Sequence, residues 1–153
     1  MSAKDVLKFI KDKEAEFVDL RFTDPRGKLQ HLTMDCTAVD EGMLNDGVFF
    51  DGSSIAGWKA INESDMTLMP DLYRSYVDPF FAQPTLAVFC DVLEPSTGEA
   101  YSRDPRGTAK AALSHMQSLG IGDTAFFGPE AEFFIFEDVK IDVSMNRAMY
   151  AID

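Results

Sequence analysis

The fold of this chain is decided by residues 17–34, which read FVDLRFTDPRGKLQHLTM. Residues 17–23 alternate apolar with polar side chains, so one face of an extended strand is apolar and the other carries Asp19 and Arg21. The next four residues, DPRG, are typical of a tight reversal because proline fixes φ and glycine tolerates positive φ. Residues 29–34 alternate again as a return strand. The stretch therefore predicts a β-hairpin.

Short elements flank this hairpin on both sides. Before it, Ser2 is a good N-cap for a helix whose apolar residues, from Val6 to Ile10, recur at helical spacing. After it, four segments have the pattern of a short helix and three strands: residues 37–44, 48–50, 66–69 and 85–92. The last of these strands is almost continuously apolar, which predicts a central position. Residues 1–100 therefore predict a small α+β domain that resembles a β-grasp.

The pattern changes after residues 94–99, EPSTGE, which read as a turn or a domain boundary. Asp104 then provides an N-cap for a helix that has proline at its first position, carries one apolar stripe and ends at a glycine. Residues 124–136 follow as a strand, and residues 137–153 show no closing pattern. We therefore expect residues 104–153 to be the unfinished start of a second domain.

Composition excludes several classes of function. The formal net charge is −12, which disfavours nucleic acid as a partner because its binding depends on Lys and Arg at the phosphates. The same charge disfavours anionic membrane surfaces, and no apolar run approaches the ~20 residues of a membrane span. Cys36 and Cys90 both lie in apolar runs, which favours reduced core thiols. The chain lacks a signal-peptide core at its start, so we expect a cytoplasmic protein.

The strand near the end carries two acidic residues in the run GPEAEFF, residues 128–134. Alternate residues of a strand share a face, so Glu130 and Glu132 are expected to project side by side, about 6.5–7 Å apart. One interpretation is a solvated strand face on an acidic protein. Several phenylalanines surround the pair, however, and predict a strand that is buried on much of both faces.

A buried carboxylate pair needs a positive partner, because burying unpaired charge costs several kcal/mol. No Lys or Arg lies within six residues of Glu130 or Glu132 on either side. Mg²⁺ and Mn²⁺ prefer carboxylate oxygen and would neutralise the pair. Two such ions, each bound by one glutamate, would fit a two-metal site for phosphoryl transfer.

A second candidate site is the loop that begins with DGSS at residues 51–54. One interpretation is a plain turn in which the Asp51 side chain bonds its own backbone. The functional interpretation is that an acidic side chain and two hydroxyls hold a small cation or a polar ligand. Ile55 and Trp58 follow, and such large apolar residues predict a loop packed against something, including another subunit as one possibility.

Three other features carry no chemistry. The run GIGDTA at residues 120–125 fits the loose dinucleotide pattern, but its glycines end a helix and precede a strand, which is the wrong order. His31 and His115 are isolated in sequence and are expected on the surface. The two cysteines have no acid–base partner in the sequence, so neither is a catalytic candidate.

Taken together, the loop and the acidic strand give the chain a resemblance to the N-terminal part of bacterial type I glutamine synthetase. Four stretches carry this resemblance in the family's order and spacing, and it extends over essentially the whole chain. They are residues 17–24, FVDLRFTD; residues 50–66, from FDGSSI through GW to INESDM; residues 103–106, RDPR; and residues 128–134, GPEAEFF.

The resemblance implies a ligase that joins ammonia to L-glutamate with ATP through a γ-glutamyl phosphate, using two Mg²⁺ or Mn²⁺ ions. It implies that Glu130 and Glu132 are metal ligands on the first strand of the catalytic barrel. It implies that Asp51 binds ammonium and helps to remove its proton, with Ser54 nearby. Family enzymes form two stacked hexameric rings, a homododecamer, in which the Asp51 loop completes a neighbour's site and Trp58 lies in the same subunit interface.

Family enzymes are about three times as long as this chain, so we expect an incomplete α/β barrel, a fragment without activity and a poorly ordered tail. Two alternatives stay open. The chain could be a complete β-grasp interaction module without catalysis. It could also be a small hydrolase that uses Glu130 and Glu132 as acid and base, although two neighbours on one strand rarely bracket a substrate.

Overall fold

The computed structural model describes residues 1–153, and the contacts within the chain divide it into two units. The first unit is Met1–Asp123 and the second is Thr124–Asp153. The first contains three α-helices and a five-stranded sheet, and the second contains a two-stranded hairpin. The α+β class expected from the sequence is confirmed.

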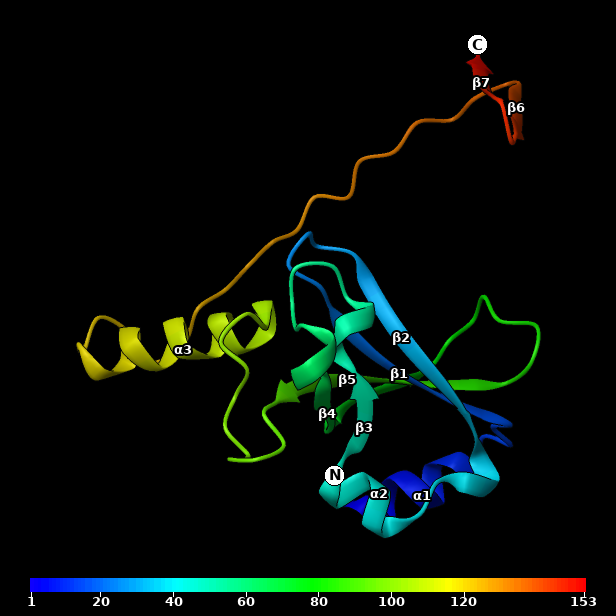
Figure 1. The fold of residues 1–153 in the computed structure, drawn as a ribbon. Helices are drawn as coiled ribbons and strands as arrows, with labels where there is room; N and C mark the ends of the chain where they lie inside the picture. The colour runs from blue at the N-terminus through cyan, green and yellow to red at the C-terminus, as the bar shows by residue number, and fades with distance from the viewer. The chain divides into compact units, whose positions relative to one another are not determined.

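The sheet is mixed and has the strand order β2-β1-β5-β4-β3 (Figure 1). β1 pairs antiparallel with β2 and parallel with β5, and β4 pairs antiparallel with both β5 and β3. β5 is therefore central, as its apolar run predicted. The strands are β1 (Phe17–Thr23), β2 (Leu29–Asp35), β3 (Val48–Asp51), β4 (Asp65–Val77) and β5 (Thr85–Leu93).

β4 is much longer than the strand expected at residues 66–69. It extends over 13 residues and has a register irregularity between Pro70 and Ser75. The proline in this strand faces Cys90 of β5, and regular pairing resumes at Ser75 opposite Val88. A proline in a strand commonly accompanies such an irregularity because it cannot donate to the ladder. The apolar pattern at residues 66–69 ends at this proline, so the sequence predicted a strand that is shorter than β4.

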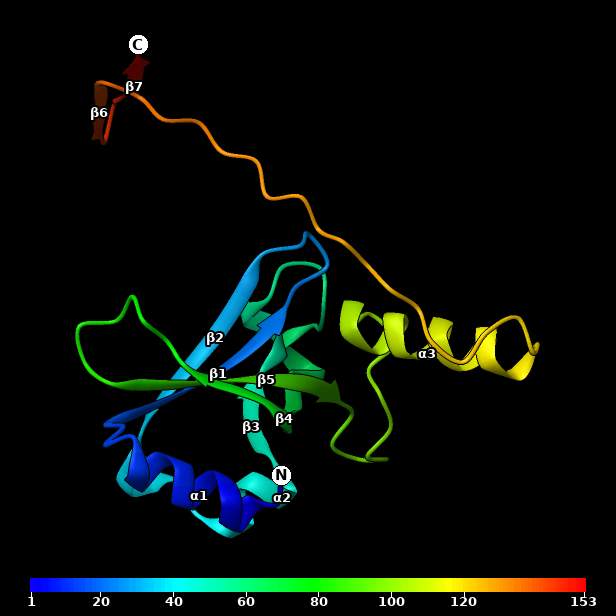
Figure 2. The same ribbon diagram turned by 180° about the vertical axis from the view of Figure 1, so that it is seen from behind.

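Two helices lie side by side on one side of this sheet (Figures 1 and 2). α1 (Ala3–Asp12) begins with the predicted cap: Ser2 accepts a hydrogen bond from the Asp5 backbone, and the Asp5 side chain accepts one from the Ser2 backbone. α2 (Glu41–Asp46) is shorter than the helix expected at residues 37–44. Val39, in extended conformation, separates it from a preceding 3₁₀ turn, and Asp40 caps it.

The core lies between these helices and the apolar face of the sheet. Val18, Leu20 and Phe22 of β1 are buried there, as the alternation in the opening hairpin predicted. Burying side chains of this size stabilises the fold by roughly 1.5–3 kcal/mol each. The other buried members are Ala3, Val6, Ile10, Val39, Leu44, Ile55, Trp58, Met66, Leu68, Leu86, Val88, Cys90, Val92 and Tyr101.

α3 (Pro105–Ser118) follows the sheet in the same unit and begins at the predicted cap, Asp104. Its last turn is followed by Gly120 with a φ of +67°, a conformation that favours glycine. None of its residues is buried, and most of the apolar stripe that the sequence predicted is exposed, with only Met116 half-buried.

The second unit differs from the sequence-based expectation. Residues 124–136 run as an extended stretch in Figure 1 but form no strand, so the strand expected there is not present. A strand is defined by hydrogen bonds to a neighbouring strand, and no segment of the chain pairs with this one. The expected tail without a closing pattern is also wrong: β6 (Val139–Ser144) and β7 (Arg147–Ile152) form an antiparallel hairpin.

The face of β1 opposite the core carries a buried ion-pair network. Arg21 Nε donates to Asp19 at 2.7 Å, Nη1 donates to the Tyr76 hydroxyl at 2.8 Å, and Nη2 donates to Asp78 at 2.6 Å. Burial opposes ionisation of Asp19, but hydrogen bonds from Arg21, His31 and Thr33 outweigh it and hold the pKa of Asp19 below its usual value. The carboxylate is therefore charged in the folded protein well into acid.

Two expectations from composition fit the structure. His31 is exposed over 56% of its side chain, although its Nδ1 lies 2.7 Å from Asp19. Both cysteines are free. Cys90 lies in the core, where burial raises its pKa to about 12, whereas Cys36 is only half-buried at the edge of the core. No helix combines the length and the apolar character that crossing a membrane requires.

The Asp19 network predicts a stability that depends on acid pH. Because the folded pKa is lowered, ionised Asp19 stabilises the fold above the unfolded value of 3.8, and this contribution is lost as pH falls through the folded pKa. We expect Asp19→Asn to lower the free energy of unfolding by about 1.5–3 kcal/mol near neutral pH. The difference in unfolding free energy between Asp19→Asn and the unmodified chain should become steadily smaller below about pH 4. Urea titrations followed by circular dichroism measure it.

The control for this prediction is Asp12→Asn, which changes an exposed carboxylate that makes no hydrogen bond. It should alter the unfolding free energy by less than about 0.5 kcal/mol at every pH. If the loss of unfolding free energy in Asp19→Asn stays constant from neutral to acid pH, the charge-based explanation is contradicted.

Candidate functional site

The Asp51 loop, residues 51–58, begins where β3 ends. Gly52–Ser54 form a 3₁₀ turn, and Asp51 Oδ1 accepts hydrogen bonds from the Ser53 backbone at 2.8 Å and the Ser53 hydroxyl at 2.6 Å. The plain-turn interpretation of this stretch is therefore correct as geometry. The hydroxyl and backbone bonds from Ser53 lower the pKa of Asp51, so this exposed side chain is a stable anion at neutral pH.

The first part of the Asp51 loop is fixed against β4. Gly52 donates its backbone N–H to the Ser64 carbonyl at 2.7 Å. A Cβ at position 52 would lie 2.4 Å from Met66 Sδ, so only glycine fits this close approach. The start of the loop is thus set by backbone hydrogen bonding and by contact with the core.

The apolar residues of the Asp51 loop pack inside their own chain. Trp58 is only 5% exposed, and its ring lies 5.5 Å from Phe22, 6.1 Å from Phe50 and 5.5 Å from Tyr101 between ring centroids. Ile55 is buried as well. Packing within the chain accounts for these large side chains, and a role for Trp58 at a subunit interface stays a prediction. Trp58 Nε1 is buried without a hydrogen-bond partner in this chain.

Asp51 and Ser54 line the same hollow. Its volume is about 300 Å³, and both residues are exposed there. Apolar side chains from β1, β2 and β3 line it together with polar groups of β2. The structure therefore brings the two predicted residues to one opening. The remaining lining residues are Phe22, Gln30, His31, Leu32, Phe50 and Ile55.

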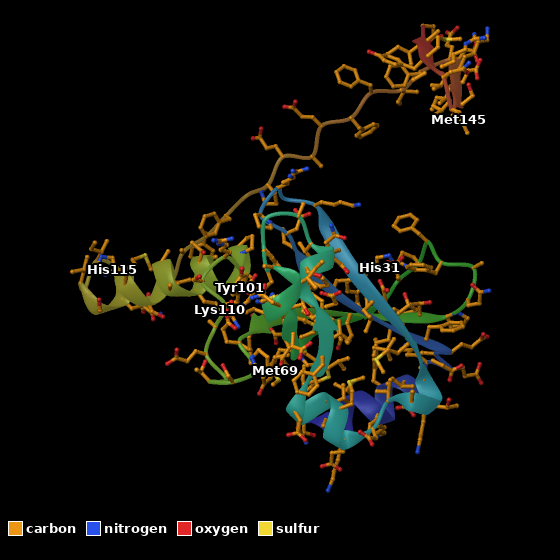
Figure 3. The ribbon with its side chains drawn as sticks, in the orientation of Figure 1. His31, Met69, Tyr101, Lys110, His115 and Met145 are labelled. Atoms are coloured by element: carbon orange, nitrogen blue, oxygen red, sulfur yellow. The ribbon has the colours of Figure 1, made fainter.

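The last part of the Asp51 loop is held by residues that precede α3. Tyr101 Oη donates to the Trp58 carbonyl at 3.1 Å, and Arg103 Nη1 donates to the carbonyls of Gly57 at 2.7 Å and Trp58 at 3.1 Å. Figure 3 labels Tyr101 in this region. Next to Trp58, Lys59 binds both carboxylate oxygens of Glu94 at 2.7 and 2.8 Å.

The start of α3 is itself joined to the sheet by charge. Asp104 is 1% exposed and accepts from the backbone N–H of Val92 in β5 and from the first turn of α3. Arg106 pairs with Asp71 and with Asp91, linking the helix to β4 and β5. The RDPR motif, residues 103–106, is thus an anchor between the sheet, the helix and the Asp51 loop.

Glu130 and Glu132 lie in the extended segment of the second unit and are both exposed. The expected burial is wrong for this chain: Phe126, Phe133 and Phe134 are 93%, 79% and 86% exposed. With no neighbouring strand or helix against it, the segment has nothing to cover its apolar side chains. No three His, Cys, Asp or Glu side chains gather anywhere in the chain in a way that would hold a metal ion.

Sequence reasoning missed the anchoring roles of Tyr101 and Arg103. Their partners are backbone carbonyls more than 40 residues away, and a carbonyl leaves no signal in a sequence pattern. The only available signal was the RDPR stretch itself, which places two arginines around a helix cap. Gln30 and His31 were also not connected with Asp51, because β2 and β3 are opposite edges of the sheet in strand order.

The fold and this loop together define the class of protein. Residues 14–95 match the family model described as the glutamine synthetase beta-Grasp domain, and residues 102–153 match the glutamine synthetase catalytic domain. The expected β-grasp is therefore confirmed. The first family match ends at residue 95 and the second begins at residue 102. The contacts within the chain instead divide it after Asp123. The expected domain limits therefore stay a prediction.

The chain belongs to the glutamine synthetase family. It is 63% identical over 152 residues to glutamine synthetase of Azorhizobium caulinodans and 52% identical over 153 residues to that of Escherichia coli K12, with 99% and 100% of the chain covered. It spans only about a third of these relatives, 32% and 33% of their lengths. A cryoEM structure of Plasmodium falciparum glutamine synthetase shares the fold, with a TM-score of 0.77 and 22% identity, over 99% of this chain and 29% of that one.

The packing of Trp58 predicts two different effects of substitution. Trp58→Ala should lower the free energy of unfolding by about 3–5 kcal/mol, because it leaves a cavity among three aromatic partners. Trp58→Phe should cost only about 1 kcal/mol, because it keeps a ring and removes a buried N–H that has no acceptor. Urea unfolding followed by circular dichroism measures both.

Phe49→Ala is the matched control, since this aromatic side chain lies on neighbouring β3 but is 72% exposed. It should change stability by less than about 0.5 kcal/mol. Equal losses for Trp58→Ala and Phe49→Ala would show that the aromatic cluster does not stabilise the loop.

Proposed function

We propose that this chain is part of an enzyme that joins ammonia to L-glutamate with ATP, through γ-glutamyl phosphate, to give glutamine, ADP and phosphate. The observation that carries this proposal is the 52–63% identity to glutamine synthetases over essentially the whole chain. The proposed setting is the cytoplasm. The chain alone is proposed to be inactive, because it corresponds to about a third of the relatives' length.

Asp51 is proposed to bind ammonium and to help remove its proton before the nitrogen attacks. Its lowered pKa is consistent with the first step, because an ionised carboxylate attracts a small cation. Its exposure beside the hollow leaves carboxylate oxygen free for a ligand, since Ser53 binds only Oδ1. Ser54, on the same opening, is proposed to contribute a hydroxyl.

Glu130 and Glu132 are proposed to bind Mg²⁺ or Mn²⁺, one glutamate to each of two ions. Carboxylate oxygen is the donor that these hard cations prefer, and bound metal helps to neutralise the phosphates of ATP. Both side chains are free of ion pairs in this chain. Two carboxylates do not complete two coordination shells, so the remaining ligands are proposed to come from residues outside this chain.

The protein is proposed to assemble as a homododecamer of two stacked hexameric rings, with the Asp51 loop completing the site of a neighbouring subunit and Trp58 near the contact. The placement of Asp51 supports this proposal. Asp51 is exposed at the end of edge strand β3, and the neighbouring Phe49 is 72% exposed, so this edge has apolar surface for a partner.

The Asp51 proposal is tested in a protein that carries this chain with a complete catalytic domain. Asp51→Asn should lower glutamine formation at subsaturating ammonium by about 10²-fold, because it removes the proposed cation partner and proton acceptor. The Michaelis constant for glutamate should change little. Asp46→Asn, an exposed carboxylate at the end of α2, is the control and should behave as the unmodified enzyme. Unchanged ammonium kinetics in Asp51→Asn would refute the assigned role.

The metal proposal is tested in the same protein by titrating Mg²⁺. Glu130→Gln and Glu132→Gln should each raise the Mg²⁺ concentration for half-maximal activity by at least about tenfold, because a neutral amide is a poorer ligand than a carboxylate. Glu99→Gln, an exposed glutamate in the turn before α3, is the control. A metal dependence that is the same in all three variants would exclude Glu130 and Glu132 as ligands.

A further inference from the structure

The Asp51 loop has two ends that are held in different ways. At the first end, Gly52 is fixed by its hydrogen bond to Ser64 and its contact with Met66. At the other end, Gly57 has a φ of +85° and no neighbour within 4 Å of a Cβ position, so no packing against Gly57 sets its conformation. The conformation of this end therefore depends on the packing of the Trp58 ring and on what the carbonyl groups of Gly57 and Trp58 contact.

Those carbonyl groups are bound by side chains from one short segment. Arg103 donates to both the Gly57 and Trp58 carbonyls, and Tyr101 donates to the Trp58 carbonyl. A hydrogen bond from a charged guanidinium is stronger than one from a neutral donor. Three bonds to two consecutive carbonyls restrict both peptide groups at the point where the loop leaves the aromatic cluster.

The segment that makes these bonds is itself fixed to the centre of the sheet. Tyr101 donates its backbone N–H to the Val92 carbonyl at 2.9 Å, and Asp104 donates its own to the Tyr101 carbonyl at 3.0 Å. The buried Asp104 side chain accepts from Val92 in return. Arg103 therefore reaches the Asp51 loop from a base formed by β5 and the first turn of α3.

We propose that Arg103, assisted by Tyr101, is a positioning residue that sets the conformation of the Asp51 loop. It links the segment matched by the catalytic-domain family model to the loop that carries the proposed ammonium-binding carboxylate. The functional part of this inference rests on the proposed role of Asp51, whereas the anchoring itself does not. A displacement of the start of α3 would move the loop through these three hydrogen bonds.

The anchoring is tested in the 153-residue chain by limited trypsin digestion with mass spectrometry. Lys59 follows the anchored carbonyls and reports opening of the loop, whereas Arg21, buried in β1, reports global unfolding. Arg103→Met keeps the aliphatic stem and removes the donors. We expect cleavage after Lys59 to become about tenfold faster in Arg103→Met, the effect of losing 1.4 kcal/mol, with cleavage after Arg21 unchanged.

Two further variants define the chemistry. Arg103→Lys keeps a charged donor and should restore most of the protection, and Tyr101→Phe should give a smaller increase because it removes one bond and keeps the ring. Arg74→Met makes the same chemical change at an arginine without a side-chain hydrogen bond or ion pair, and it should match the unmodified chain. Trp58 is the only tryptophan, so greater quenching of its fluorescence by acrylamide in Arg103→Met reports the same opening.

Equal cleavage after Lys59 in Arg103→Met and Arg74→Met would overturn the proposal. A rise of the same size after Lys59 and Arg21 would also overturn it, because it would show a loss of global stability. If Arg103→Met unfolds the chain, cleavage after Lys59 and after Arg21 is compared in Tyr101→Phe instead. Unchanged cleavage after Lys59, or an equal rise at both sites, would again overturn the proposal.

The functional part is tested in a protein with a complete catalytic domain. Arg103→Met should raise the Michaelis constant for ammonium about tenfold, with little change in the constants for glutamate and ATP. Arg103→Lys should return the constant for ammonium to near its unmodified value. If Asp51→Asn impairs ammonium use and Arg103→Met does not, the positioning proposal fails and the role of Asp51 stands. If neither variant affects ammonium use, the proposed role of Asp51 fails instead.

Discussion

The carboxylate of Asp104 joins the three parts of the structure that matter for function. It is almost fully buried, and it accepts backbone hydrogen bonds from Val92 at the end of β5 and from Arg106 and Gly107 at the start of α3. A buried charge is stable only when such donors surround it, and the helix N-terminus adds favourable electrostatics. Because Asp104 fixes the backbone at this point, Tyr101 and Arg103 reach the Asp51 loop from a defined position. Loss of this one carboxylate would remove one of the links between the sheet and the helix, and it would weaken the base from which Tyr101 and Arg103 hold the loop.

The second unit illustrates the opposite situation. Its extended segment has the residues of a buried strand, with two glutamates among phenylalanines, yet it forms no ladder and buries no aromatic ring. Apolar side chains stabilise a strand only when another layer removes them from water, and backbone groups pair only with a neighbouring strand. Within this chain neither partner exists. The two carboxylates therefore lack, within this chain, the neighbouring donors that the proposed metal site would need.

The sequence separation of the interacting residues determines which parts of the fold could be predicted from sequence alone. The cap at Ser2, the opening hairpin and the cap at Asp104 depend on residues within a few positions of each other, and all were predictable. The parallel pairing of β1 with β5 joins residues about 70 positions apart and leaves no local signal. The same is true of the hydrogen bonds from Arg103 to the loop. Of the site, sequence predicted the residues on the hollow but not the groups that hold them.

The turn at Asp51 shows why the structural and the functional interpretation of the loop need not compete. Ser53 donates two hydrogen bonds to one carboxylate oxygen of Asp51 to form the turn, and the same bonds lower the pKa of Asp51. Ile55 and Trp58 are buried within their own chain, so the loop has a defined conformation in the absence of a binding partner. A charged group held in advance loses little conformational entropy on binding a cation, and its field is already oriented. The residues that close the core of the domain are therefore the ones that would present a rigid carboxylate to a ligand or to a neighbouring subunit.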